Sequence, residues 1–155
     1  MSFLIQALNR KNVEPYLSLN EAGLVDKGAR WVTATHFPGF PCRVSLQDAS
    51  VGERVLLLPF THLDTTSPYR ASGPIFVREQ ACYAEMIPNQ VPDFLRHRVI
   101  SVRGYSSEDM MLDATTVNGN AIEQGIDSLF ANPQVHYLHL HNAGPGCYMC
   151  KVNRC

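Results

Sequence analysis

Short apolar segments, rather than long periodic ones, dominate the hydrophobic pattern of this chain. The stretch 54–60, Arg-Val-Leu-Leu-Leu-Pro-Phe, is a continuous apolar run of strand length, which is typical of a strand covered on both faces. Prolines and glycines recur at short intervals between such segments and divide the chain into strands and turns. We therefore predict strands over 3–8, 30–35, 42–46, 54–60, 75–77, 99–103, 111–117, 135–141 and 147–152.

Helical periodicity is confined to two segments. Over 121–130, apolar residues recur at i, i+4, i+7 and i+8 from Ile122, which predicts a helix with one apolar face. A shorter helix is predicted over 20–25, with Asn20 as its N-cap. The whole pattern predicts an α+β fold: one domain over residues 1–155, with a mostly antiparallel β-sheet and one or two short helices packed against it.

The composition excludes several classes of protein. A hydrophobic fraction of 45% with 17% charged residues is a normal globular balance, and the net charge of −1 gives no general attraction to nucleic acid or membranes. No segment approaches the roughly 20 apolar residues of a membrane span. Five cysteines, an odd and scattered set, favour reduced thiols. We expect a soluble, cytoplasmic protein that binds neither nucleic acid nor membrane. The sequence leaves open whether the protein forms a homo-oligomer.

Three segments together carry a family resemblance. They are Pro-Gly-Phe-Pro-Cys-Arg-Val-Ser-Leu at 38–46, Ser-Pro-Tyr-Arg-Ala-Ser-Gly-Pro-Ile-Phe-Val at 67–77, and His-Leu-His-Asn-Ala at 139–143 with Gly146-Cys147 shortly after. The chain resembles a bacterial family defined only as a domain of unknown function, and the similarity spans nearly its whole length. Because that family has no established activity, the resemblance implies a bacterial single-domain protein and nothing catalytic.

The C-terminal hairpin holds the first candidate site. Alternate strand residues share a face, so Tyr137, His139 and His141 point the same way. A loop over 142–146 would set His141 opposite Cys147 and His139 opposite Met149, with facing Cβ atoms about 5 Å apart. An imidazole beside a thiol activates it as a nucleophile, so Cys147 and His141 are predicted catalytic residues and His139 a ligand-binding one. The alternative is that the histidines form the polar side of an amphipathic strand and Cys147 fills space at its turn.

The same hairpin contains the donor types of a zinc site. His139 and His141 precede a Cys-x-x-Cys pair, Cys147 and Cys150. In a strand, however, positions 147 and 150 face opposite sides, with Cys150 on the same face as Tyr148, and no second Cys-x-x-Cys pair is present. We therefore expect structural cysteines, no metal and no cofactor.

The long segment 61–74, predicted as a loop, holds the second candidate site. Arg70 lies among hydroxyls and glycine, a setting that suits a carboxylate or phosphate ligand. His62, at the end of the preceding strand, adds acid–base capacity and is a third predicted catalytic residue. The alternative is that Arg70 pairs with Asp64 and holds loop carbonyls. The predicted ligand-binding residues of this segment are Tyr69, Arg70 and Ser72. Arg43, which follows the turn at 38–42, is predicted to join the same pocket, the alternative being a salt bridge on the surface.

Two functions remain open from the sequence, and so does enzymatic activity itself. The first is a binding or catalytic site for a small anionic molecule, formed by the 61–74 loop and the C-terminal hairpin. The second is a non-enzymatic oligomerisation or protein-interaction module. A concave pocket favours the first if it unites Arg70, His139, His141 and Cys147. A flat exposed apolar face around Tyr69 and Phe76 favours the second.

Overall fold

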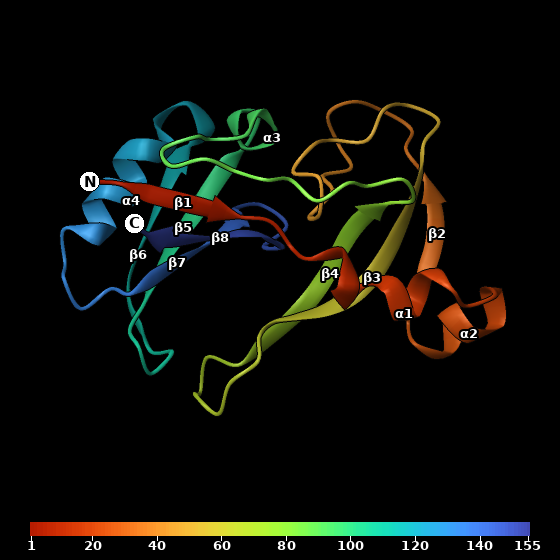
Figure 1. Cartoon of the computed structure of the whole chain (residues 1–155), viewed down its shortest axis with the longest axis horizontal. Helices are drawn as coiled ribbons and strands as arrows, with labels where there is room; N and C mark the ends of the chain where they lie inside the picture. The colour runs from red at the N-terminus through yellow and green to blue at the C-terminus, as the bar shows by residue number, and fades with distance from the viewer.

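The protein consists of two antiparallel sheets, as a computed structural model covering residues 1–155 shows (Figure 1). The fold class is the predicted one, with the strands divided between two sheets rather than one. The five-stranded sheet has the order β1–β8–β7–β5–β6, with β1 (Phe3–Gln6), β5 (Val99–Tyr105), β6 (Met111–Asn118), β7 (Tyr137–Asn142) and β8 (Tyr148–Arg154). The three-stranded sheet has the order β2–β3–β4, with β2 (Arg30–Thr33), β3 (Arg54–Leu63) and β4 (Ala71–Arg78).

The helices are few and short, and both predicted ones are confirmed. Asn20 caps α2, and its Oδ1 accepts a hydrogen bond of 2.9 Å from the Gly23 amide. None of the helices has the length and hydrophobicity that crossing a membrane requires. They are α1 (Glu14–Leu17), α2 (Glu21–Asp26), α3 (Asp93–Arg96) and α4 (Ile122–Phe130), with 3-10 turns η1 (Arg10–Asn12) and η2 (Gly119–Ala121).

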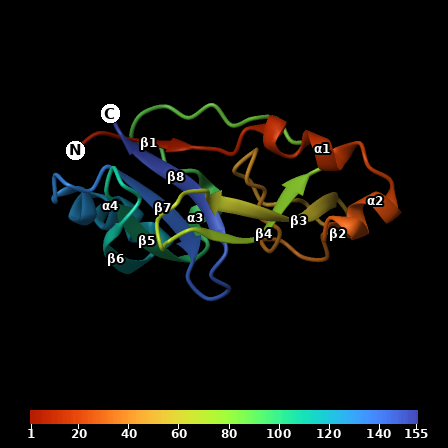
Figure 2. The ribbon, with the colours of Figure 1, turned by 90° about the horizontal axis from the view of Figure 1, so that it is seen from below.

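The two faces of the five-stranded sheet have different neighbours. Leu138 and Leu140 of β7 are buried in the core that the apolar face of α4 completes. The alternate residues His139 and His141 point to the other face, where their rings meet that of His62 from β3. Figure 2 shows β3 and β4 approaching β7 and β8 on this side. Polar and aromatic side chains of β7 therefore lie between the sheets.

The predicted register of the C-terminal hairpin is wrong. His141 lies opposite Tyr148 rather than Cys147, and His139 opposite Lys151 rather than Met149. The ladder shifts between Leu140 and His141, where a β-bulge adds one residue to β8. A one-residue shift moves a side chain to the opposite face, so Tyr148 joins the histidines instead of sharing the face of Cys150.

Other strand bounds differ from the predictions by a few residues, and two differences concern the segments of the candidate sites. Residues 42–46 form no strand, because only isolated bridges at Pro41 and Cys42 precede a turn. The predicted 61–74 loop is shortened to 64–70, since β3 continues to Leu63 and β4 begins at Ala71. Prolines are tolerated in these two strands because Pro74 is on the edge strand β4, and Pro59 lies beyond the part of β3 that β2 covers.

Gly119 is expected to be essential for packing α3 against η2. A Cβ atom at this position would lie 2.1 Å from the carbonyl oxygen of Leu95 and 2.7 Å from Cα of Arg96. Because backbone must move to make room, Gly119→Ala should lower the free energy of unfolding by about 2 kcal/mol in urea denaturation. Gly144→Ala, where a Cβ meets nothing within 4 Å, is the matched control and should stay within about 0.5 kcal/mol. Equal effects of the two substitutions would contradict the packing argument.

Candidate functional site

A cluster of four rings joins the two sheets, and we call it the histidine cluster. It consists of His62 from β3, His139 and His141 from β7, and Tyr148 from β8. The centroid of the His62 ring lies 4.9 Å from that of His141 and 5.9 Å from that of His139. The His62 ring also stacks on Tyr148, with centroids 5.3 Å apart and planes 7° from parallel. The structure thus brings together all three histidines that the sequence singled out.

Each histidine of the cluster has a buried ring nitrogen without a hydrogen-bond partner. These atoms are Nδ1 of His62, Nδ1 of His139 and Nε2 of His141. Nδ1 of His141 donates to the carbonyl oxygen of Gly146 at 2.9 Å, which leaves a lone pair on its Nε2. Buried polar groups without partners are uncommon in folded proteins, so their concentration in one cluster marks this junction as unusual.

Burial keeps these imidazoles neutral. It lowers the pKa of His62 and of His141 to about 4 and that of His139 to about 3, and in each it is the largest cause. The Arg103 guanidinium lowers the pKa of all three further. Neutral imidazoles are metal ligands, but no group of three or more His, Cys, Asp or Glu side chains is arranged to hold a metal ion.

A cleft of about 400 Å³ lies beside the histidine cluster, between β3–β4 and the β7–β8 hairpin. Its wall is apolar where Leu57, Ile75, Phe76 and several prolines line it. A small number of polar groups in an otherwise apolar wall is the usual construction of a small-molecule site. The polar lining consists of Arg43, His97, Arg98, Asn142 and Cys147.

Arg43 is buried in this cleft without a carboxylate partner. Arg43 is 2% exposed. Its Nε donates a hydrogen bond to the Tyr148 carbonyl at 2.7 Å, and its Nη1 donates one to the Pro41 carbonyl. Its Nη2 donates no hydrogen bond within the protein, and none of the ion pairs includes it. Burial lowers the pKa of Arg43 to about 10, so the side chain stays positive at neutral pH.

The second guanidinium of the cleft is compensated. Arg98 donates from Nη1 and Nη2 to the two carboxylate oxygens of Asp48, at 2.9 and 2.6 Å. This bidentate pair is nearly enclosed, with side chains 10% and 1% exposed. The cleft therefore carries one unbalanced positive charge, that of Arg43.

Cys147 is partly exposed and lines the same cleft. No hydrogen bond joins it to His141, so the predicted imidazole–thiol pair is not formed. Arg43 lines the same cleft instead. Burial lowers the pKa of Arg43, and among the influences that oppose this lowering the one from Cys147 is the largest. Across the hairpin, the backbone amide of Asn142 donates a hydrogen bond to the Cys147 carbonyl at 2.9 Å and fixes the backbone there.

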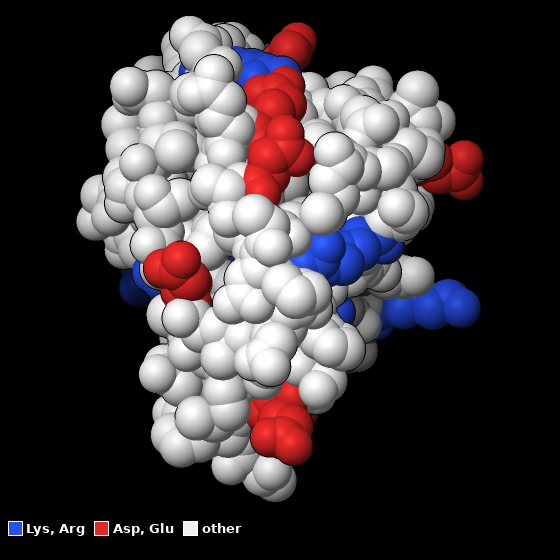
Figure 3. All heavy atoms as spheres, turned by 90° about the vertical axis from the view of Figure 1, so that its left-hand side faces the viewer, with Lys and Arg blue, Asp and Glu red and all other residues white.

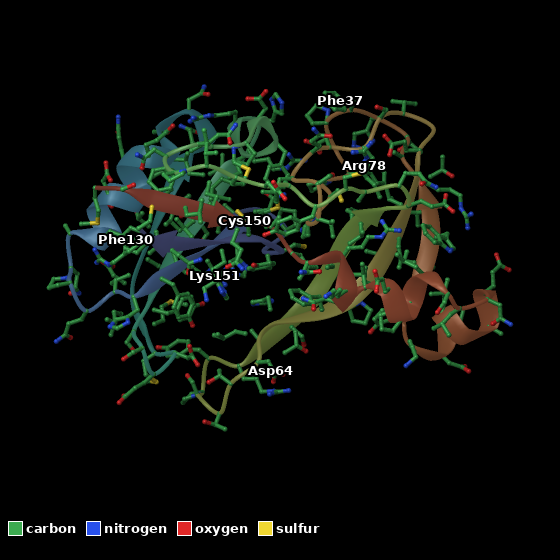
Figure 4. All side chains as sticks on the ribbon, in the orientation of Figure 1. Phe37, Asp64, Arg78, Phe130, Cys150 and Lys151 are labelled. Atoms are coloured by element: carbon green, nitrogen blue, oxygen red, sulfur yellow. The ribbon has the colours of Figure 1, made fainter.

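The remaining predicted residues lie elsewhere. Arg70 pairs with Asp64 at the loop between β3 and β4, and both side chains are more than half exposed. Figure 4 shows Asp64 toward the lower edge of the molecule, where the loop leaves β3, and Phe37, which precedes the Pro38 that lines the cleft, at the upper edge. The pocket that would unite Arg70 with the hairpin is therefore not formed.

Tyr69 and Ser72 are also outside the cleft. The Tyr69 ring packs edge-on against Tyr105, with centroids 6.4 Å apart. Ser72 lines a separate hollow of about 300 Å³ beside Phe60. Of the predicted site residues, Arg43 and Cys147 thus reach the cleft, the three histidines form the cluster beside it, and Tyr69, Arg70 and Ser72 belong to neither.

The sequence predictions missed three polar residues of the cleft: His97, Arg98 and Asn142. Asn142 lies within one of the segments that carry the family resemblance, which was the one available signal for it. Nothing in the spacing connects His97 and Arg98 with Asn142, which comes more than 40 residues later. Their proximity arises from the pairing of β5 with β7, which sets Ile100 opposite Asn142.

Comparisons with known proteins place these residues within a family. A family model described as protein of unknown function (DUF1203) matches residues 39–154, a range that includes Arg43, Cys147 and the histidine cluster. No curated protein and no solved structure matches the chain. The chain therefore belongs to the DUF1203 family of proteins of unknown function, which confirms the expected membership of a family defined only as a domain of unknown function.

Proposed function

We propose that this protein binds a small organic anion in the cleft, with Arg43 as the counter-charge. The observation that carries the proposal is that Arg43 is 2% exposed, positively charged and without a carboxylate partner. An unpaired buried charge is costly, and buried charges in proteins are ordinarily paired. A ligand anion would supply the missing partner.

The charge balance of the cleft favours a monoanion. Arg98 is already paired with Asp48, so a single positive charge is left for a ligand. A planar guanidinium with a free Nη2 suits a carboxylate, and the wall of prolines and Phe76 suits an organic body. A volume of about 400 Å³ is within the range of small-molecule sites. A small carboxylic acid fits these features better than inorganic phosphate does.

Nucleic acid is not the anion that we propose. The net charge of the chain is −1. On the face that Figure 3 shows, acidic and basic side chains are interspersed among uncharged ones, and no broad basic area is visible. A nucleic-acid surface requires clustered positive charge. All five cysteines are free thiols, which supports the further proposal that the protein works in a reducing compartment such as the cytoplasm.

The proposal is tested by titrating the protein with benzoate and with benzamide, its neutral analogue, while amide and guanidinium NMR signals are recorded. Benzoate is expected to shift the signals of Arg43 Nε–H and of the Asn142 amide saturably, and benzamide is not. Arg43→Gln should weaken benzoate binding at least tenfold, because it removes the one positive charge of the cleft that no carboxylate of the protein balances. Arg43→Lys keeps the charge and should retain part of the affinity.

Arg70→Gln is the matched control. Arg70 is also a predicted anion-binding arginine, but it is exposed and already paired with Asp64. Its removal should leave benzoate binding unchanged. Binding that survives in Arg43→Gln and disappears in Arg70→Gln would overturn the proposed site and restore the 61–74 segment as the candidate. Thermal unfolding of each variant establishes that it is folded under the conditions of the titration.

A further inference from the structure

We infer that Cys147 is the reactive group of this cleft and attacks an electrophilic carbon of a carboxylate held by Arg43. The inference rests on the proposed function and deepens it: the ligand class is a small monocarboxylate that carries a leaving group on a carbon near the carboxylate. The two residues lie in the same cleft, on separate segments that the fold brings together.

The environments of the five cysteines differ sharply. Cys42 and Cys150 are buried, and the Cys42 sulfur accepts hydrogen bonds from the amides of Ser45 and Arg78. Burial raises the pKa of the Cys150 thiol, which makes it inert. Cys82 and Cys155 are exposed and line none of the described clefts. Cys147 is therefore the one thiol that is both reachable and placed beside a buried cation.

The charge of Arg43 brings the ligand to the sulfur. The thiolate of Cys147 is the nucleophile of the proposed reaction. The Arg43 guanidinium attracts the carboxylate of the ligand and so raises the concentration of the ligand next to the sulfur. No acidic side chain competes, because the carboxylate of Asp48 is held by Arg98.

The position of the thiol is fixed by the hairpin. The Asn142 amide donates to the Cys147 carbonyl, and the Gly146 amide donates to the Asn142 carbonyl at 2.7 Å. Gly146 has a φ of 83°, a backbone conformation that favours glycine and that directs the chain from the turn into Cys147. Cys147 immediately precedes β8, and a side chain next to a paired strand is better positioned than one in a free loop.

The reaction is a displacement at carbon. The thiol first releases its proton to solvent, and an electron pair of the thiolate sulfur then forms an S–C bond. The bond between that carbon and the leaving group breaks, and the leaving group departs with the bonding electrons. The product is a thioether on Cys147 whose carboxylate remains beside Arg43. No oxidant, reductant or metal is required.

Iodoacetate and iodoacetamide test the inference, because they differ in charge and are nearly equal in size. Alkylation rates are measured for each cysteine separately by peptide mass spectrometry, with Cys82 and Cys155 as internal references on the same chain. The ratio of the iodoacetate rate to the iodoacetamide rate at Cys147 should exceed the ratio at the reference cysteines at least fivefold. Arg43→Gln should reduce it to the reference value, and Arg70→Gln should leave it unchanged.

Failure of this inference and failure of the proposed function give different results. If benzoate binds in an Arg43-dependent manner but Cys147 shows the reference ratio, or reacts with neither reagent, the reactive role of Cys147 is wrong and the anion site stands. If benzoate does not bind and Cys147 shows no preference, both are wrong. Benzoate should also slow alkylation of Cys147 by iodoacetate while leaving Cys82 unaffected. Arg43→Lys guards against a folding defect of Arg43→Gln and should keep a ratio above the reference.

Discussion

Acidification from pH 7 to pH 5 is expected to lower the free energy of unfolding by roughly 3–4 kcal/mol. His139 and His141 are 3% and 1% exposed, and burial lowers the pKa of the first to about 3 and of the second to about 4. In the unfolded chain both titrate near pH 6.5. The unfolded state therefore binds more protons below that pH, and stability falls as the pH drops from about 6.5 toward the folded-state pKa values.

The interval between pH 7 and pH 5 isolates this effect from the carboxylates. Hydrogen bonds from Arg78, Arg96 and Tyr137 lower the pKa of Glu53, Glu123 and Asp109 respectively. Stability from a carboxylate with a lowered pKa is present above its unfolded value and is lost only below it, that is, below about pH 4.5. His62 acts in the same direction as the other two histidines but is more exposed, so it adds to the loss without dominating it.

Urea denaturation at half-unit steps of pH measures the effect, and His139→Phe provides the control. Phenylalanine keeps a ring between the sheets but cannot bind a proton, so the loss of stability between pH 7 and pH 5 should shrink by about half. Replacement of the exposed His136 by Gln should leave the pH dependence as it is in the wild type. Parallel curves for wild type and His139→Phe would show that the histidine cluster does not couple protonation to folding.

The hydrophobic pattern predicted most of the helices and strands because each depends on residues that are near one another in the sequence. The apolar face beginning at Ile122 predicted α4, and the run over 54–60 predicted the first part of β3. The same alternation placed His139 and His141 on one face of β7, as observed. What alternation does not show is a bulge, and the one between Leu140 and His141 changed the residue opposite His141. Cys147 therefore does not face His141, and it lines the cleft with Arg43.

The candidate site depends on contacts that no local pattern contains. Arg43 and Arg98 are alike as residue types, and each precedes an apolar segment. Only the fold brings Asp48 to Arg98 and leaves Arg43 without a carboxylate. The unusual feature of Arg43 is thus an absent partner, and absence of a partner is a property of the whole tertiary structure. His62 likewise reaches the other histidines because β3 continues to Leu63, beyond residue 60, where the predicted strand ends.

Asp48→Ala is expected to lower the free energy of unfolding by about 3–5 kcal/mol, because it leaves Arg98 charged, enclosed and unpaired. The Asp48 carboxylate accepts both hydrogen bonds from Arg98 and a third, at 3.2 Å, from the Gly39 amide. The double variant Asp48→Leu with Arg98→Met removes both charges and should be less destabilised than Asp48→Ala. Asp64→Ala breaks the exposed pair with Arg70 and should cost less than about 1 kcal/mol in the same urea titration.

The same substitution tests why the cleft should prefer a monoanion. Without Asp48, two unbalanced guanidinium groups face one cleft, so its charge rises by one unit. Inorganic phosphate, which the wild type is expected to bind poorly, should then bind Asp48→Ala at least tenfold more tightly and recover part of its lost stability. Asp64→Ala frees an arginine outside the cleft and should show no such gain. If phosphate binds Asp48→Ala no better than wild type, Arg98 does not contribute its charge to the cleft, and the charge count behind the proposed ligand class is wrong.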